Sequence, residues 1–224
     1  MREEAIKAQA EEEMSLGQVL SEKSIRWQLI SICLMMLCQQ LSGINAVFFY
    51  TNKIFAAAGY SEATQLKLSV LIGAENVIMT FVSMSMMEKM GRKSLMVWGY
   101  GIMVVFCFAM VGVLNCLDKA TWVPHLSVFC VMGYIVGFAI GPGPVPWIWN
   151  TEFFQQSARA GGATISCVIC WVCTFLVGQF FPAIQLKIGA YVFVFFGGIC
   201  LFAFFYIKAK LPETKGKIDM STVR

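Results

Sequence analysis

The sequence predicts an all-α membrane protein with six transmembrane helices, because of its composition and the way its charges are distributed. Hydrophobic residues make up 58% of the 224 residues and charged residues only 13%, about half the charge that soluble domains carry. The charges lie in short clusters between long apolar runs, of which five are uncharged and a sixth contains one acid, Glu75. Each run has about 20 residues or more, the length a helix needs to cross a hydrocarbon core of roughly 30 Å.

The predicted spans divide the chain into three parts. Residues 1–26 form a polar cytoplasmic lead-in segment, residues 27–207 form the six-helix bundle, and residues 208–224 form a cytoplasmic tail. The spans are expected at residues 27–55, 66–87, 95–116, 126–149, 161–182 and 189–207. Because the first 26 residues are polar, no cleavable signal peptide is expected there.

Six spans place both termini on one side of the membrane, and the basic residues indicate which side. If the N-terminus is cytoplasmic, thirteen of the 17 Lys and Arg residues are cytoplasmic, and only Lys53, Lys67, Lys119 and Lys187 lie outside. This asymmetry follows the positive-inside rule, so both termini are expected in the cytoplasm. The basic excess is explained without a nucleic-acid partner, and the lipid bilayer of the cell membrane is the expected surrounding.

The motif GPGPVPW at residues 141–147 breaks an uncharged run long enough to cross the bilayer. Pro142 and Pro144 lack amide hydrogens, and Gly141 and Gly143 loosen the remaining backbone. At membrane depth, broken backbone is tolerated only where protein or a water-filled cavity satisfies it. The motif therefore predicts an interior crevice with a hinge, and Trp147 at its edge.

A second polar interruption, QQLSGIN at residues 39–45, lies near the middle of the first span. The side-chain amides of Gln39, Gln40 and Asn45 offer both donors and acceptors. Gly43 allows a bend that frees backbone groups. We interpret this cluster as a substrate contact. The alternative is a set of hydrogen bonds between helices, each worth about 1 kcal/mol.

The aromatic residues that follow this cluster suggest a gate. Phe48, Phe49 and Tyr50 continue toward the outer face of the membrane. They fit either a lipid-facing aromatic belt or an external gate over the pocket, and we assign Phe49 and Tyr50 to the gate.

The second span carries Glu75 and Asn76 near its middle. Polar and ionisable residues there usually face the protein interior. Asn76 is therefore expected to line the cavity. Glu75 fits two roles equally, pairing with a polar group on another helix or taking part in transport.

Charged turns end two pairs of spans and suggest an internal repeat. Glu88 and Arg92 flank the first turn, and Glu152 and Arg159 flank the second. Glu213, in the motif LPETKG after the last span, is placed to reach a neighbouring arginine.

Three cysteines share the spacing of some iron–sulfur ligands, but they lie within a span. Cys167, Cys170 and Cys173 are flanked by apolar residues, which favours packing over metal binding. No metal or cofactor is expected. The chain also lacks a phosphate-binding loop and a Ser–His pair, so an enzyme is not expected.

The motifs together resemble the sugar-porter family of the major facilitator superfamily, especially the animal facilitative glucose transporters. QQLSGIN, the GRK turn at residues 91–93, GPGPVPW, the E-x₆-R turn and PETKG follow the order and spacing of that family. The match covers about residues 22–218. It corresponds to the carboxyl-terminal six helices of a twelve-helix protein, so an amino-terminal half is implied as a partner.

The resemblance also implies roles for individual residues. The residues that look like hexose-contacting amides are Gln39, Gln40, Asn45 and Asn76. Trp147 and Trp171 look like indoles that line the pocket. The residues that look like a cytoplasmic salt-bridge latch, with partners in the amino-terminal half, are Glu88, Arg92, Glu152 and Arg159. Two positions depart from the glucose-transporter pattern: Ala139 stands where Glu is usual, and Cys170 where Asn is usual.

The sequence thus supports a facilitative hexose transporter working by alternating access, represented here by its carboxyl-terminal half. Amides suit the hydroxyl groups of a hexose or a related neutral polyol, and the absence of Lys and Arg at mid-depth disfavours an anionic substrate. Two alternatives remain: a half-carrier that pairs with or regulates a full-length transporter without transporting, and a proton-coupled sugar symporter.

Overall fold

The computed structural model describes residues 13–57, 59–116, 119–120 and 122–215, without the side chains of residues 50, 53, 54 and 57. All the elements of these residues are helical, which confirms the predicted all-α fold. In chain order the helices are α2 (Leu16–Ser21), α3 (Arg26–Leu41), α4 (Ile44–Ala57), α5 (Glu62–Met90), α6 (Arg92–Leu114), α7 (Val123–Ile140), α8 (Val145–Glu152), α9 (Gln156–Ile188), the short 3₁₀ turn η2 (Gly189–Tyr191) and α10 (Val192–Lys210).

The described residues contain five stretches long and apolar enough to span a membrane. The last of them, Gln156–Lys210, has 55 residues and comprises two helices, α9 and α10, which η2 separates. Counting those two helices separately gives the six crossings expected from the sequence. The first crossing consists of α3 and α4, and the fourth of α7 and α8, each interrupted near its middle.

The fifth span is longer than predicted. We expected it to end at Pro182, but α9 continues through this residue to Ile188, so that prediction is wrong. Proline removes one backbone hydrogen bond and does not necessarily end a transmembrane helix, because neighbouring helices support the chain on both sides. Phe181, directly before the proline, is buried in the core.

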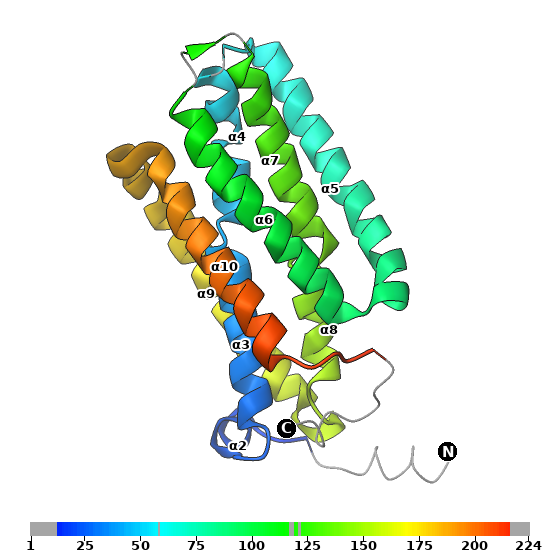
Figure 1. Ribbon diagram of the computed structural model, residues 1–224. Coiled ribbons are helices and arrows are strands. Elements are labelled where there is room, and N and C mark those ends of the chain that lie inside the picture. The colour runs from blue at the N-terminus through cyan, green and yellow to red at the C-terminus, as the bar shows by residue number, and fades with distance from the viewer. Residues whose placement is uncertain (1–12, 58, 117–118, 121, 216–224) are drawn as a thin grey trace.

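The helices form one bundle, shown in Figure 1. Helix α6 packs against α7 and α10, α3 packs against α9, and α5 packs against α7. Helix α4 continues α3 toward the top of Figure 1, and α8 continues α7 toward the bottom. The α6–α7 contact is close because it is lined by glycines: a Cβ atom on Gly137 would lie 3.0 Å from the carbonyl oxygen of Gly99. This is the contact expected of small residues spaced four apart in a membrane helix.

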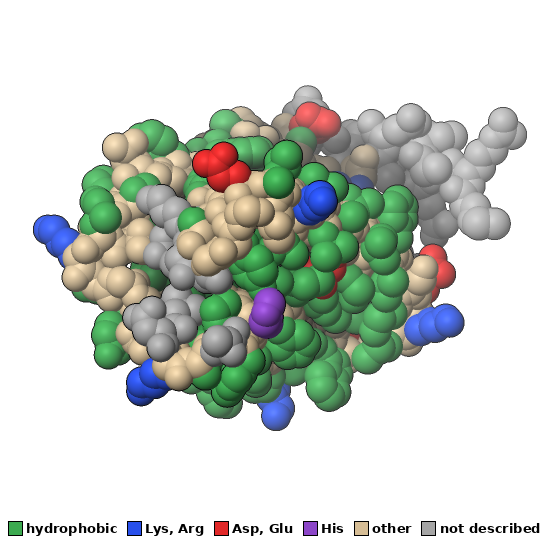
Figure 2. All heavy atoms as spheres, turned by 90° about the horizontal axis from the view of Figure 1, so that it is seen from above, with side chains coloured by type: hydrophobic (Ala, Val, Ile, Leu, Met, Phe, Trp, Pro, Cys, Tyr) green, Lys and Arg blue, Asp and Glu red, His purple; other side chains and the backbone are tan. Residues whose placement is uncertain are grey.

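The outer surface of the bundle is apolar. Large hydrophobic side chains are exposed along α5, α9 and α10, among them Phe81, Phe175 and Phe205. Seen from the α4–α5 end, hydrophobic side chains dominate the face, and the Lys and Arg side chains lie mostly at its edges (Figure 2). Such a surface is suited to contact with lipid tails or with further apolar helices.

Candidate functional site

A cavity of about 390 Å³ lies between the two helix breaks. It is lined by residues of α3, α4, α5, α7, α8 and α9 and of the second break: Gln39, Gln40, Ile44, Asn45, Phe48, Asn76, Thr80, Phe138, Ala139, Gly143, Pro144, Trp147, Cys170, Trp171 and Thr174. None of the described residues that line it is charged. The cavity thus combines amides and hydroxyls with aromatic surface.

The first break places three amides around this cavity. Gly43 has a φ of 89°, a left-handed conformation that side chains with a Cβ atom disfavour. The break separates Gln39 and Gln40, at the end of α3, from Asn45, at the start of α4. The Gln40 Oε1 accepts a hydrogen bond from the Asn45 Nδ2 at 2.8 Å, so the two amides meet across the break.

The second break follows directly from its prolines. In a continuous helix, Pro142, Pro144 and Pro146 would each have to donate an amide hydrogen that proline lacks. Three carbonyls, those of residues 138, 140 and 142, therefore lose their helical partners. Each carbonyl has another donor. The Gly143 amide bonds the Phe138 carbonyl at 2.8 Å, the Ser83 hydroxyl bonds that of Ile140, and the Gln39 amide bonds that of Pro142 at 2.7 Å.

The side chain of Gln39 hydrogen-bonds the backbone of this second break. Its Nε2 also donates to the Gly143 carbonyl at 2.8 Å, so both amide hydrogens bond backbone. Its Oε1 accepts from the Gln40 Nε2 at 3.3 Å, and the side chain is only 1% exposed. Gln39 therefore holds the cavity wall in place, while Gln40 and Asn45 present their amides at its surface.

Cys170 lines the cavity beside these two glutamines. The Gln40 Nε2 donates to the Cys170 Sγ at 3.1 Å, and the thiol lies 3.9 Å from the Gln39 Oε1. A thiol is a weak acceptor, so the hydrogen bond from the Gln40 amide to Cys170 is weak. A ligand hydroxyl would be a stronger acceptor for the same donor.

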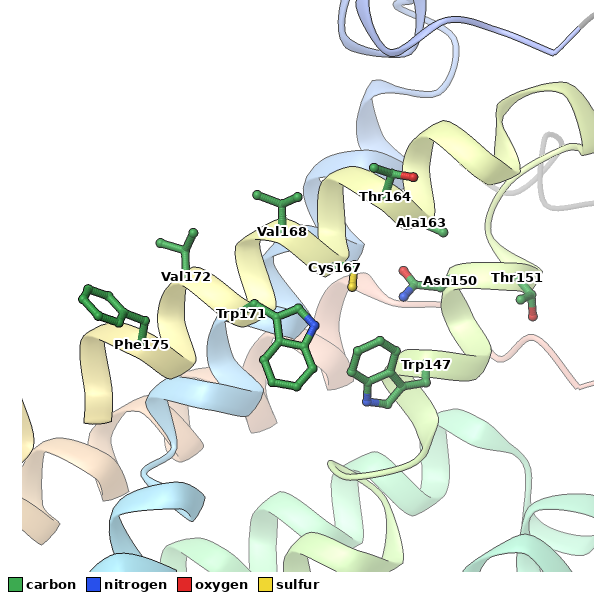
Figure 3. A pocket seen from close by; sticks show the side chains of 10 residues that line it. All are labelled: Trp147, Asn150, Thr151, Ala163, Thr164, Cys167, Val168, Trp171, Val172 and Phe175. Atoms are coloured by element: carbon green, nitrogen blue, oxygen red, sulfur yellow. The ribbon is translucent and has the colours of Figure 1, made fainter. Parts of the chain in front are cut away.

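Asn76 and Trp171 complete the predicted lining. Asn76, in α5, is half-buried, and its backbone carbonyl accepts a hydrogen bond from Thr80 one turn later at 2.8 Å. Trp147, in α8, and Trp171, in α9, face one another (Figure 3). They are 41% and 62% exposed, which leaves the cavity open on this side.

The two indoles also line a second pocket, which is mostly apolar. It has a volume of about 820 Å³ and lies between α8 and α9, toward Thr151 and Thr164 (Figure 3). Its one buried amide is Asn150, whose Oδ1 accepts a hydrogen bond from the Ser166 hydroxyl at 2.7 Å. Trp147 and Trp171 therefore stand between the two spaces.

The aromatic residues considered for the gate lie in different surroundings. Phe48, rather than Phe49, lines the cavity. The Phe49 ring is 66% exposed, and the side chain of Tyr50 lies outside the described part of the structure. The hinge residues Gly141, Pro142, Gly143 and Pro144 form the break between α7 and α8, and Gly143 and Pro144 line the cavity itself.

Two hydroxyl-bearing lining residues received no role in the sequence analysis. Thr80 lies four residues after Asn76, and Thr174 lies three residues after Trp171. Residues three or four apart share a helix face, so this spacing was the available signal. The Thr174 hydroxyl bonds the Cys170 carbonyl at 2.9 Å.

A polar network closes the α8 end of the bundle. The guanidinium of Arg92 lies 2.8 Å from a carboxylate oxygen of Glu152. Glu213 accepts hydrogen bonds from the backbone amides of Arg92 and Lys93, at 2.8 and 3.1 Å, and so caps the start of α6. The Thr214 hydroxyl donates to the second Glu152 oxygen at 2.6 Å. The segment after α10 is thereby joined to α6 and α8.

The other two residues assigned to the latch are placed differently. Glu88 is exposed near the end of α5. Arg159 is also exposed, and its guanidinium bonds the side chain of Gln156 at 3.0 Å in its own helix. Among the described residues, the ion pair therefore joins the two charged turns through Arg92 and Glu152.

Comparison with known proteins places this cavity in context. Residues 1–220 match the family described as Sugar (and other) transporter. Human solute carrier family 2, facilitated glucose transporter member 7, is 41% identical over 217 residues, and the horse member 5 is 37% identical over 220 residues. Both alignments cover 97% of this chain but only 42% and 44% of the relative, so the chain spans about two fifths of their length.

Solved structures share the fold. The proton:xylose symporter XylE bound to 6-bromo-6-deoxy-D-glucose has a TM-score of 0.76 at 23% identity, over 84% of this chain and 40% of that one. The inward-open conformation of XylE from E. coli has a TM-score of 0.70, over 85% and 39%. With its apolar helices, its cavity and these matches, the chain is a multi-pass membrane protein that belongs to the Sugar (and other) transporter family.

Proposed function

We propose that this chain is the carboxyl-terminal half of a facilitative hexose transporter that works by alternating access. The observation that carries the proposal is the uncharged cavity between two broken helices, lined by amides on one side and indoles on the other. Transporters of this general design bind substrate near the midplane, where discontinuous helices expose backbone and polar groups.

The substrate is a neutral polyol of the hexose class. Hydroxyl groups need partners that both donate and accept, and the amides of Gln40, Asn45 and Asn76 supply both. The rings of Trp147 and Trp171 supply apolar faces against which the C–H face of a sugar packs. Facilitated glucose transporters among the relatives support this class of substrate.

An amino-terminal six-helix half is the partner that covers the open side of the cavity. Trp171 is 62% exposed, and α5 and α9 present apolar side chains to their surroundings. The relatives are more than twice as long as the matched region. In the proposed cycle, this bundle rocks against the other half around the midplane site.

The protein lies in the cell membrane with both termini in the cytoplasm. The described ends of the bundle, α2 and the end of α10, lie at the same end (Figure 1), and the basic asymmetry of the sequence favours that end as cytoplasmic. In this orientation the Arg92–Glu152 pair and Glu213 form a cytoplasmic latch. The exposed charges of Glu88 and Arg159 remain available to the other half.

The proposal is tested by radiolabelled hexose uptake into proteoliposomes. The chain is joined to the amino-terminal half of human facilitated glucose transporter member 7, and the chain alone serves as the second sample. Asn76→Ala should reduce uptake at least severalfold. Asn115→Ala is the matched control, because Asn115 caps the far end of α6 and does not line the cavity. Equal uptake by both variants and the parent would exclude the proposed site.

Glu75 favours proton coupling as a second candidate function. It precedes the cavity residue Asn76, and among the described residues its Oε2 is buried without a hydrogen-bond partner. An unpaired carboxylate is very unfavourable at mid-membrane, so the group is expected to carry a proton there. Uptake driven by an inward proton gradient in the parent but not in Glu75→Gln would establish coupling. Uptake indifferent to the gradient would leave the facilitative mechanism.

The same uptake assay, together with co-purification, distinguishes a half-carrier that only pairs with a full-length transporter. Such a protein would co-purify with the full-length relative and show no uptake, either alone or when joined to an amino-terminal half.

A further inference from the structure

Each of the two helix breaks is held by a side chain from the helix that contains the other break. Gln39 lies near the end of α3 and donates to the carbonyls of Pro142 and Gly143, 103 and 104 residues away. Tyr134 lies in α7 and donates its hydroxyl to the carbonyl of Ser42, 92 residues away, at 2.8 Å. The relationship is therefore reciprocal.

Both bonding side chains are enclosed by protein. Tyr134 is fully buried, Gln39 is 1% exposed, and Ser42 is fully buried. Ser42 and Pro142 are buried as well, so if either carbonyl loses its partner no water replaces it, and an unpaired buried carbonyl is unfavourable. Neither break can therefore change its backbone geometry freely while the other remains fixed.

Other backbone groups at the two breaks form hydrogen bonds within their own segment of the chain. At the first break the Ser42 hydroxyl bonds the Gln39 carbonyl at 2.7 Å, and the Val47 amide bonds the Gly43 carbonyl at 2.8 Å. At the second, the Val145 amide bonds the Gly141 carbonyl at 3.0 Å. Within the described part of the chain, the side-chain hydrogen bonds of Gln39 and Tyr134 are those that link each break to the helix that contains the other.

We propose that the two breaks form one coupled hinge, in which Gln39 and Tyr134 are positioning residues. A change of bend at residues 42–43 pulls on residues 142–143 through Gln39, and the Tyr134 hydroxyl ties α7 to the first break. Gln39 has both amide hydrogens bound to backbone, so its effect on a ligand is exerted through the wall it positions. The consequence for uptake rests on the proposed transport function, but the coupling itself is a property of the unliganded chain.

Hydrogen–deuterium exchange tests the coupling without reference to transport. Tyr134→Phe removes one hydroxyl and keeps the ring. It should accelerate exchange at the amides of residues 43–47 and also at those of Gly143, which lies in the other break, and of Val145 and Trp147, which follow it. Acceleration confined to residues 43–47, or none at either break, would overturn the coupled hinge.

Tyr206→Phe is the matched control. Its hydroxyl bonds Ser31 between α10 and α3 at 3.0 Å, away from both breaks. The same chemical change should leave exchange at residues 143–147 as in the parent. If the control accelerates exchange there as much as Tyr134→Phe does, general loosening of the bundle explains the result and the proposal fails.

A double-mutant cycle adds a functional test in the transporter that is joined to an amino-terminal half. The loss of one neutral buried hydrogen bond corresponds to about a 2- to 12-fold change in an equilibrium. Tyr134→Phe and Gln39→Met should each change the maximal uptake rate, and the double variant should match the more severe single variant. Multiplied effects would show independent breaks and overturn the proposal. If Gln39→Met does not fold, or if no variant transports, the exchange comparison of Tyr134→Phe with Tyr206→Phe decides alone.

Discussion

The guanidinium of Arg92, at the start of α6, lies 2.8 Å from the carboxylate of Glu152, at the end of α8. Both side chains are about a quarter exposed, so water screens the pair and its contribution to stability is small, about 0.2–1 kcal/mol. The pair joins α8, the helix after the second break, to α6, which has no break. Its main effect is therefore on the conformation that the bundle favours.

Replacing Arg92 by Ala should open the α8 end more than it destabilises the fold. Cys167 lines the pocket between α8 and α9, so its labelling by a membrane-impermeant thiol reagent, followed by peptide mass spectrometry, measures the opening. We expect faster labelling and a thermal midpoint within a few degrees of the parent. Arg159→Ala, in an exposed position, should leave labelling unchanged. Equal labelling of all three proteins contradicts the latch.

Glu213→Ala should destabilise α6 at its first turn. The carboxylate bonds two backbone amides there and also lies at the positive end of the helix dipole. Loss of such a cap typically lowers stability by about 0.5–2 kcal/mol. Thermal unfolding in detergent is the measurement, with Glu88→Ala as the exposed acidic control. A midpoint as high in Glu213→Ala as in the control would refute the capping role.

Gly43→Ala should be among the most destabilising small substitutions in the chain. The residue has a positive φ, and a Cβ atom there would collide with the ring of Phe196. Gly73→Ala is the matched control in α5, where a Cβ atom would meet nothing within 4 Å and helix propensity favours Ala by about 1 kcal/mol. The yield of monodisperse protein and its thermal midpoint should fall only for Gly43→Ala. A normal midpoint in that variant would mean that the break is not built as described.

Trp171→Phe should weaken hexose binding. A smaller ring loses part of the aromatic contact, for which about 0.5–1.5 kcal/mol is typical, or about a 2- to 12-fold rise in the KM for uptake. Trp122→Phe, at an equally exposed indole at the start of α7, should leave the KM unchanged. An unchanged KM in Trp171→Phe would remove that indole from the proposed site.

The sequence predicted much of the cavity because its signals are local. Three prolines and two glycines close together at residues 141–146 predict a break in the helix, and Gly43, within a polar cluster, predicts another. The polarity of residues 39–45 and of Asn76 is out of place in a membrane unless these residues face inward. We assigned polar and aromatic residues of four predicted spans to one lining. All of the following line the cavity: Gln40, Asn45, Asn76, Trp147 and Trp171.

What escaped prediction depends on contacts between distant segments or on the rotation of a helix after a break. The hydrogen bond from the Gln39 amide to the Pro142 carbonyl joins residues 103 apart in the sequence, and no local pattern encodes it. The rotation of α4 after the break at Gly43 decides which aromatic side chain meets the cavity, and in the structure Phe48 lines it. Pro182 would end an isolated helix, but packing carries α9 past it.

The cap that Glu213 provides has a consequence for biosynthesis. The turn at Gly91 and the first amides of α6 emerge from the ribosome 121 residues before their acceptor. At roughly 5–20 residues per second, the nascent chain waits about 6–24 s for that carboxylate. During this interval the turn must be satisfied by water or lipid headgroups, so the first turn of α6 is completed only when a carboxylate 121 residues further along the chain has been translated.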